Sequence, residues 1–170
     1  MLWRRFGYQS VLEDFVTQLE VGRRAPAFTL KDQQGKPVKL SAFKGKRVVV
    51  YFYPKADTPG CTTQSCSLRD AMPDLKKLKT AVIGISPDSP ERQKKFDTKY
   101  KLGFPLLADE EHKVAEAWGT WGEKTLYGRK YMGVIRSAFV IDEQGKVAAA
   151  FYKVSPKDTV PKVTRALKDE

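Results

Sequence analysis

Four apolar runs along the chain have the pattern of buried β-strands. Residues 47–53 (RVVVYFY) are continuously β-branched or aromatic, which is typical of a central strand covered on both faces. Residues 81–86 (AVIGIS) have the same character. Residues 135–141 and 146–152 flank the turn sequence Asp-Glu-Gln-Gly, and this arrangement predicts a hairpin.

Helical signals lie between and after these runs. A helix over residues 61–79 is expected after the first strand, and Pro73 should kink or interrupt it because proline lacks an N–H. Ser89 is followed by proline, as an N-cap followed by proline at the first helical position would be, which predicts a helix to about residue 101. Two shorter helices are expected, one over 113–118 and one starting near Ser155.

Weaker patterns complete the outline. Residues 28–30 and 38–40 flank Gln-Gly-Lys-Pro and predict a small N-terminal hairpin. A short strand is expected at 105–107. Residues 119–134 are rich in glycine and aromatic residues, and we interpret them as a long loop. Apolar residues at helical spacing over 9–20 predict an amphipathic N-terminal helix that docks on the domain or on a partner.

The order β-α-β-α-β-α-β-β-α predicts an α/β fold with a central mixed β-sheet flanked by helices. A cysteine directly after the first core strand and a closing hairpin followed by a helix indicate a thioredoxin-like fold. To this the chain adds the N-terminal hairpin and the extra N-terminal helix.

Composition narrows the class of protein. The chain has 170 residues, 41% hydrophobic and 30% charged, which fits one globular domain, and no apolar run approaches the ~20 residues that span a bilayer, so no membrane partner is expected. The start of the chain lacks a secretory apolar segment, and we expect a cytoplasmic location. The net charge of +11 is spread over the chain with acidic residues interleaved, so no nucleic-acid partner is expected.

The candidate chemistry lies at Cys61 and Cys66, the only two cysteines. Two cysteines cannot form a disulfide-stapled framework, and with a single histidine, His112, no metal site is expected. Cys61 follows Pro-Gly in the first turn of the predicted helix, where unpaired N–H groups favour an anionic thiolate. The hydroxyl of Thr58 could hydrogen-bond the sulfur or an incoming oxygen. The alternative is a buried, unreactive cysteine.

The spacing of the two cysteines predicts motion. Five residues along an intact helix rise about 7.5 Å and turn Cys66 away from the face of Cys61, whereas a disulfide needs Cα atoms about 4.4–6.8 Å apart. The two thiols can therefore pair only if the helix unwinds locally. A static disulfide is not expected.

The run Pro54-Lys-Ala-Asp-Thr58-Pro-Gly-Cys61 resembles the P-x-x-x-T-x-x-C motif of the peroxiredoxins. A second cysteine five residues later is similar to the PrxQ or bacterioferritin-comigratory-protein branch. The similarity extends from about Val21 to the C-terminus and includes GISPDS and WGEKTLYGRKYMGVIRSAFVID. It divides the chain into an N-terminal extension, 1–20, and a peroxiredoxin domain, 21–170. One departure is Gln64, where the family often has an acidic residue.

The resemblance assigns roles to five residues. Cys61 would be the peroxidatic cysteine, which becomes a sulfenic acid, and Cys66 the resolving cysteine, which forms an intramolecular disulfide with it. Thr58 would orient the peroxide and Pro54 would shield the sulfur. Arg136, at the start of an apolar run, would steady the thiolate and the peroxide; without the resemblance it could equally be a surface arginine at a strand edge.

The resemblance therefore implies a thioredoxin-dependent peroxidase acting on hydrogen peroxide and organic hydroperoxides, without a metal or organic cofactor. A thioredoxin- or glutaredoxin-like protein would regenerate it. A monomer is expected, and the N-terminal helix is a feature that could support a weak dimer. Two alternatives remain open: a peroxide sensor or thiol-disulfide exchange protein, and a basic α/β binding module with incidental cysteines. The second leaves the spacing of Pro54, Thr58, Cys61 and Cys66 unexplained.

Overall fold

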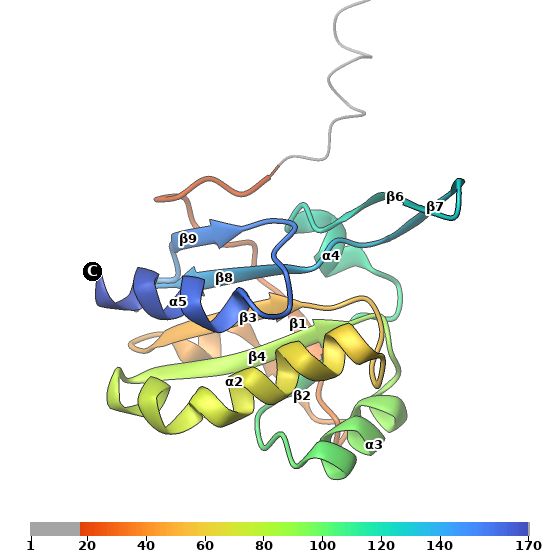
Figure 1. The fold of residues 1–170 in the computed structure, drawn as a ribbon. Helices are drawn as coiled ribbons and strands as arrows, with labels where there is room; N and C mark the ends of the chain where they lie inside the picture. The colour runs from red at the N-terminus through yellow and green to blue at the C-terminus, as the bar shows by residue number, and fades with distance from the viewer. Residues whose placement is uncertain (1–17, 170) are drawn as a thin grey trace, which may run out of the picture.

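The computed structural model describes residues 18–169, in which a mixed seven-stranded sheet is flanked by helices on both faces (Figure 1). The strand order is β2-β1-β5-β4-β3-β8-β9, and β6 and β7 form a separate two-stranded sheet. The strands are β1 (Thr29–Lys31), β2 (Pro37–Lys39), β3 (Arg47–Phe52), β4 (Thr80–Ser86), β5 (Leu106–Ala108), β6 (Trp121–Leu126), β7 (Arg129–Val134), β8 (Ser137–Ile141) and β9 (Val147–Phe151). The helices are η1 (Leu40–Phe43), α2 (Pro59–Lys77), α3 (Pro90–Tyr100), α4 (Lys113–Ala117) and α5 (Thr159–Lys168).

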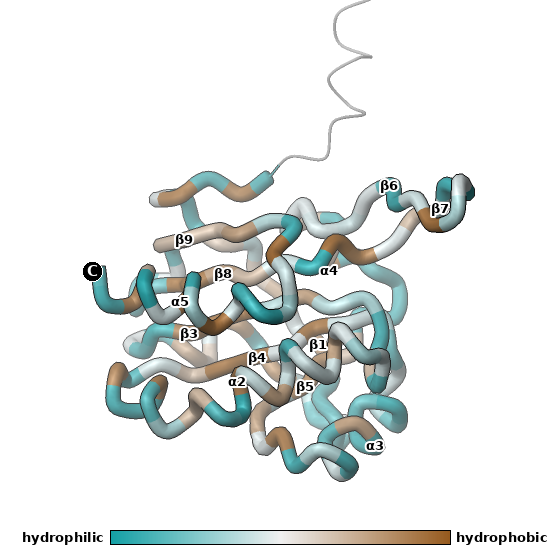
Figure 2. The backbone as a smooth tube through the Cα atoms, in the orientation of Figure 1, coloured by the Kyte–Doolittle hydropathy of each residue, from teal (hydrophilic) through white to brown (hydrophobic). Residues whose placement is uncertain are grey.

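The strand β3 lies in the interior of the sheet, between β4 and β8, as its continuous apolar run predicts. It pairs in parallel with β4 and antiparallel with β8, so that Val50 faces Ile83 on one side and Phe139 on the other. Residues 48–52 are at most 1% exposed. Figure 2 shows the same concentration of apolar residues along β3, β4 and β8. The predicted α/β class, with a mixed sheet and an N-terminal hairpin (β1–β2), is confirmed.

Two apolar clusters cover the faces of the sheet. On one face α2, α3 and α5 contribute side chains such as Leu68, Phe96 and Val163. On the other, Trp118 and Phe28 pack with residues of η1 and α4. Because both clusters are buried, packing fixes β3 and β8 in position. The residues that follow β3 and precede β8 are therefore anchored to a rigid sheet.

Helix α2 corrects one prediction. We expected Pro73 to kink or interrupt the helix; it does not interrupt the helix, which is continuous from Pro59 to Lys77 with Pro73 inside it. Leu68 and Leu75, on either side of the proline, are both buried against the sheet. This packing keeps both halves of the helix against the sheet, although the proline removes one backbone hydrogen bond.

The structure of residues 119–134 also differs from the prediction. They form an antiparallel hairpin, β6–β7, rather than the long loop that their composition suggested. The turn is made by Tyr127 and Gly128, both with positive φ (50° and 77°), as a type I′ turn requires. Glycine suits this conformation but tyrosine rarely adopts it, so the sequence lacks the usual Asn-Gly signal.

The remaining predicted elements are confirmed, including α3 with Ser89 as its N-cap and the β8–β9 hairpin. Within residues 18–169, no helix has the length and apolar character needed to cross a membrane. The helix predicted over 9–20 lies outside the described residues, apart from residues 18–20, which have no regular structure.

Candidate active site

Cys61 is the third residue of α2 and its side chain is buried, with 1% exposed. Pro59 occupies the first helical position, where a backbone N–H would have no acceptor within the helix, so proline costs no hydrogen bond there. Thr58 is the N-cap, and its carbonyl accepts the first intrahelical bond, from Thr62 N (2.8 Å). Cys61 therefore sits in the first turn, as predicted, where unpaired backbone N–H groups and the helix dipole favour a negative charge.

Arg136 reaches Cys61 from the residue preceding β8. Its Nη2 donates to the Cys61 sulfur at 3.4 Å, and its Nη1 donates to Gln64 Oε1 at 2.8 Å. The pairing of Phe52 with Ser137 explains the approach, because it places the start of β8 beside the end of β3, where the active-site loop begins. The guanidinium places a positive charge beside the sulfur, where it can pair with negative charge on the sulfur or on a bound oxygen.

Gln64 connects this contact to the last helix. It is fully buried and lies one turn after Cys61 on the same side of α2. Its Nε2 donates to Thr159 Oγ1 (3.0 Å), and that hydroxyl donates to Ser155 O (3.0 Å). The side chain thus ties Arg136 to the start of α5. The sequence showed Gln64 only as a departure from a family pattern, and nothing in it indicated Thr159.

Thr58 and Pro54 belong to the loop before Cys61, and neither side chain is hydrogen-bonded to the sulfur. The hydroxyl of Thr58 donates to Lys55 O at 2.8 Å, not to Cys61, which leaves its oxygen free to accept a hydrogen bond. Pro54 is half-buried at the start of the loop and lines a hollow together with Asp88 and Arg92. Both residues belong to the loop 54–58 that connects β3 to α2.

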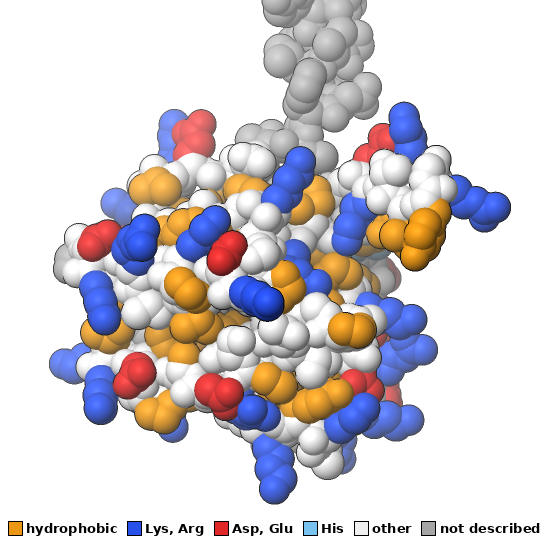
Figure 3. All heavy atoms as spheres, in the orientation of Figure 1, with side chains coloured by type: hydrophobic (Ala, Val, Ile, Leu, Met, Phe, Trp, Pro, Cys, Tyr) orange, Lys and Arg blue, Asp and Glu red, His pale blue; other side chains and the backbone are white. Residues whose placement is uncertain are grey.

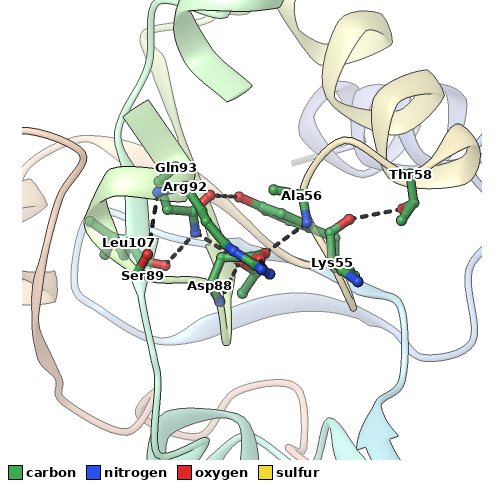
Figure 4. A network of polar contacts seen from close by, with 10 residues as sticks. Lys55, Ala56, Thr58, Asp88, Ser89, Arg92, Gln93 and Leu107 are labelled. Atoms are coloured by element: carbon green, nitrogen blue, oxygen red, sulfur yellow. Dashed lines mark hydrogen bonds and ion pairs between the residues drawn. The ribbon is translucent and has the colours of Figure 1, made fainter. Parts of the chain in front are cut away.

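Asp88, in the GISPDS stretch, fastens this loop to the sheet (Figure 4). Its Oδ2 accepts from Ala56 N (2.7 Å) and from Ser86 Oγ (2.7 Å), and its side chain is nearly buried. Gln93 completes the network by donating to Ser86 Oγ and accepting from the Tyr53 hydroxyl. A buried acceptor with this many partners holds the loop rigidly.

A second tie holds the next residue of the loop. Asp57 adopts a positive φ of 59°. Its carboxylate accepts from Lys99 Nζ (2.9 Å) and from the Tyr100 hydroxyl (2.7 Å), both at the end of α3. These two donors, Lys99 first, lower the pKa of Asp57. The loop 54–58 is therefore attached to β4 and α3 at two successive residues.

Cys66 lies on α2 as a half-buried free thiol, and Cys61 is also free. Both residues fall within one continuous helix, so the geometry that separates them in the sequence prediction holds in the structure. Between them, Ser65 is buried and hydrogen-bonds the Tyr51 hydroxyl at 2.8 Å. Burial raises the pKa of that hydroxyl well above its usual range.

Lys124 is a cation near the site that the sequence did not reveal, because residues 119–134 were interpreted as a loop. It extends from β6, and its Nζ donates to Val134 O at 2.9 Å. Partial burial, followed by the charge of Arg136, lowers the pKa of Lys124, and its ammonium also interacts electrostatically with Cys61. Because Val134 lies two residues before Arg136, the base of the β6–β7 hairpin borders the Arg136–Cys61 contact.

Among the described residues, no group of three or more His, Cys, Asp or Glu side chains is arranged to hold a metal ion. His112 stacks on Trp121 with ring centroids 3.8 Å apart and contacts Glu116. His112 therefore packs at the base of the β6–β7 hairpin, and it is 46 residues after Cys66 in the sequence.

Comparisons with known proteins identify the family to which the chain belongs. The AhpC/TSA family model matches residues 21–150. Peroxiredoxin Bcp of Bacillus subtilis is 47% identical over 151 residues, covering 89% of this chain and 96% of that protein. Peroxiredoxin Bcp of Escherichia coli is 52% identical over 133 residues, covering 78% and 85%. The structure of Xanthomonas campestris Peroxiredoxin Q superposes with a TM-score of 0.82 at 32% identity, covering 88% of this chain and 98% of that one. The chain therefore belongs to the AhpC/TSA family, in its Bcp/PrxQ branch of peroxiredoxins, and is a thiol-dependent peroxidase.

Proposed function

We propose that Cys61 is the peroxidatic residue. Its thiolate attacks one oxygen of the peroxide, so that an S–O bond forms, the O–O bond breaks and the other oxygen leaves as water or an alcohol after taking up a proton. The observation that carries this assignment is the 3.4 Å contact between Arg136 Nη2 and the sulfur at a buried helix N-terminus. The same guanidinium would stabilise the charge that develops on the departing oxygen.

Thr58 and Pro54 act in this proposal as the walls of the peroxide pocket. The Thr58 hydroxyl donates to Lys55 O, so its oxygen can accept the proton of a hydroperoxide and orient it toward Cys61. Pro54 brings no N–H to the loop and limits the access of water. The hydrogen bonds that Asp88 accepts from Ala56 and that Asp57 accepts from Lys99 support both roles, because they fix the loop before the substrate arrives.

Cys66 is the resolving residue in the second step. Its thiol attacks the Cys61 sulfenic acid, an S–S bond forms and water leaves. Since α2 is continuous over both residues, its first two turns must unwind for the sulfurs to meet. A dithiol protein of the thioredoxin type, or a glutaredoxin-like one, then reduces the disulfide by exchange.

The wider setting follows from this cycle. Hydrogen peroxide and organic hydroperoxides are the proposed substrates, with no metal or organic cofactor in the reaction. A cytoplasmic location would supply the reducing thiols that the cycle consumes. We propose that the protein acts as a monomer, because the resolving thiol lies on the same chain as Cys61 and no second copy is needed to complete the disulfide.

The test is peroxide consumption driven by a thioredoxin system, with wild type compared with Cys61→Ser and Cys66→Ser. We expect Cys61→Ser to be inactive. Cys66→Ser should consume about one equivalent of peroxide and then stop, because it forms the sulfenic acid but no internal disulfide. Full activity of Cys61→Ser would overturn the assignment.

Far-UV circular dichroism tests the motion independently. Formation of the Cys61–Cys66 disulfide, verified by mass spectrometry, should reduce the helical signal of the wild-type protein. An unchanged helical signal with the disulfide present would contradict local unwinding.

A further inference from the structure

Exposed large apolar side chains concentrate on one small element. Within residues 18–169 they are Val21, Leu126, Tyr127, Tyr131 and Met132, and all except Val21 belong to the β6–β7 hairpin. Tyr127 is 96% exposed. Figure 3 shows the apolar group on the projecting hairpin with lysine and arginine side chains around it. Apolar clusters of this kind on a folded domain mark interaction sites.

The hairpin projects beyond the body of the domain (Figure 1). It is a separate two-stranded sheet, and only its base is packed, through Trp121 on His112 and buried Val134. An isolated two-stranded ribbon has little stability of its own in water. A long, apolar tip on such a ribbon is a liability for folding, and this makes a binding role the natural explanation.

The register of the hairpin separates its two faces. Lys124 lies opposite Tyr131, and Leu126 lies opposite Arg129, so these four side chains share one face. Lys124 Nζ contacts Val134 O at 2.9 Å, two residues before Arg136, which donates to the Cys61 sulfur. The face made by Lys124, Leu126, Arg129 and Tyr131, here called the docking face, therefore belongs to the side of the hairpin that borders the active site.

The charge of the hairpin limits what can bind there. Residues 121–134 contain Lys124, Arg129 and Lys130 against a single acid, Glu123, which pairs with Lys130 at 3.6 Å. The docking face itself carries two cations and no acid. A two-fold contact with another copy would bring these cations together, in a chain whose net charge is +11. A partner with an acidic rim and an apolar centre is favoured instead.

We infer that the docking face binds the protein reductant, a small dithiol protein whose redox site has an apolar surface and an acidic rim. The inference rests on the proposed function, since it concerns the disulfide formed by Cys61 and Cys66. A thiolate of the partner attacks one sulfur of that disulfide, forming a mixed disulfide and releasing the other cysteine. The second thiol of the partner then breaks the mixed disulfide, so the partner leaves oxidised and the peroxidase reduced.

The test compares two reductants in the same assay: thioredoxin, which must dock, and dithiothreitol, which need not. The variant Leu126→Ser/Tyr131→Ser alters the docking face at two exposed positions. We expect its KM for thioredoxin to rise at least about tenfold, so that at thioredoxin concentrations well below KM the ratio of dithiothreitol-driven to thioredoxin-driven turnover rises by the same factor. Met132→Ser, on the opposite face of the same hairpin, and Val21→Ser, elsewhere on the domain, are the matched controls and should change this ratio less than twofold.

Charge provides a second arm of the test. Arg129→Glu should raise the KM for thioredoxin at low salt and flatten its dependence on salt, whereas Lys94→Glu on α3 should do neither. An unchanged KM in the double variant and in Arg129→Glu would overturn the docking face. So would a loss of activity that is equal with both reductants, because that would place the effect at Cys61, or a change in sedimentation showing that the face joins two copies. Failure of the proposed function is distinguishable, because the wild-type protein would then be inactive with both reductants.

Discussion

Replacement of Gly60 by alanine should lower peroxidase activity without weakening the fold. A Cβ on Gly60 would lie 2.9 Å from Arg136 Nη2 and 3.5 Å from Pro156 Cγ. The first distance is shorter than real Cβ contacts allow, and the guanidinium, as the end of a flexible side chain, is the group that moves. The φ angle of Gly60 lies outside the left-handed region, so the alanine backbone itself is not strained.

The expected loss follows from the contact that this movement breaks. Arg136 Nη2 lies 3.4 Å from the Cys61 sulfur, while Nη1 remains tied to Gln64. A hydrogen bond to a charged group contributes about 1.5–3 kcal/mol, and each 1.36 kcal/mol corresponds to about tenfold in rate. Complete loss of the contact would therefore lower kcat/KM for peroxide by about 10- to 150-fold. Stability should rise by up to about 1 kcal/mol, because alanine is the better helix former.

The assay measures kcat/KM for hydrogen peroxide at saturating reductant and follows thermal unfolding by circular dichroism. Thr98→Ala, on the exposed side of α3, is a control that raises helix propensity far from the sulfur in sequence. In the double variant Gly60→Ala/Arg136→Met, the glycine change should cost nothing beyond the loss of the arginine. Full activity in Gly60→Ala, or losses that add in the double variant, would refute the argument that alanine acts through the guanidinium.

Three further outcomes are expected. Asp88→Ala removes the acceptor for Ala56 N–H, which should raise the KM for peroxide more than it lowers kcat and cost about 1.5–3 kcal/mol in urea unfolding. Gln64→Leu removes the acceptor for Arg136 Nη1 and should reduce kcat/KM several-fold, whereas Gln64→Glu, which keeps the acceptor, should restore most of it. Because burial lowers the pKa of Lys124, the unfolded chain binds more protons between that lowered value and the ordinary 10.5; stability should therefore rise with pH across this window in wild type and rise less in Lys124→Met, as measured by urea unfolding.

The central strands could be predicted because their signal is local. Residues 48–52 and 82–86 are buried on both faces, and this environment selects continuous β-branched and aromatic residues. The start of α3 could also be predicted from local sequence, because the Ser89 hydroxyl accepts a hydrogen bond from Arg92 N–H as an N-cap does. In contrast, the β6–β7 hairpin turns at Tyr127, whose left-handed conformation is rare for tyrosine, and few residues of its two strands are buried, so neither strand shows the alternation of a half-buried strand.

Some features of the active site could also be predicted from the sequence, and others could not. Cys61 at a helix start follows from the Pro-Gly sequence before it, and the family motif supplied the contact with Arg136 that the structure contains. The bonds that position these groups join residues far apart in the chain. Gln64 and Thr159 are 95 residues apart, and Ala56 and Asp88 are 32 apart. No spacing rule within a helix or strand encodes such pairs, so only the assembled fold reveals them.

In the structure, the loop 54–58 and the first turns of α2 are held by different sets of hydrogen bonds. The loop 54–58 is tied to β4 and α3 through Asp88 and Asp57, whereas the first turns of α2 are tied to β8 and α5 through Gln64. Unwinding of residues 61–66 breaks the second set of bonds and leaves the first intact. In the proposed cycle, oxidation of Cys61 replaces a thiolate by a neutral sulfenic acid, which removes the charge that holds Arg136 on the sulfur. The helix start therefore loses one of its ties when the resolving thiol has to reach it, while the pocket wall stays in place for the next peroxide.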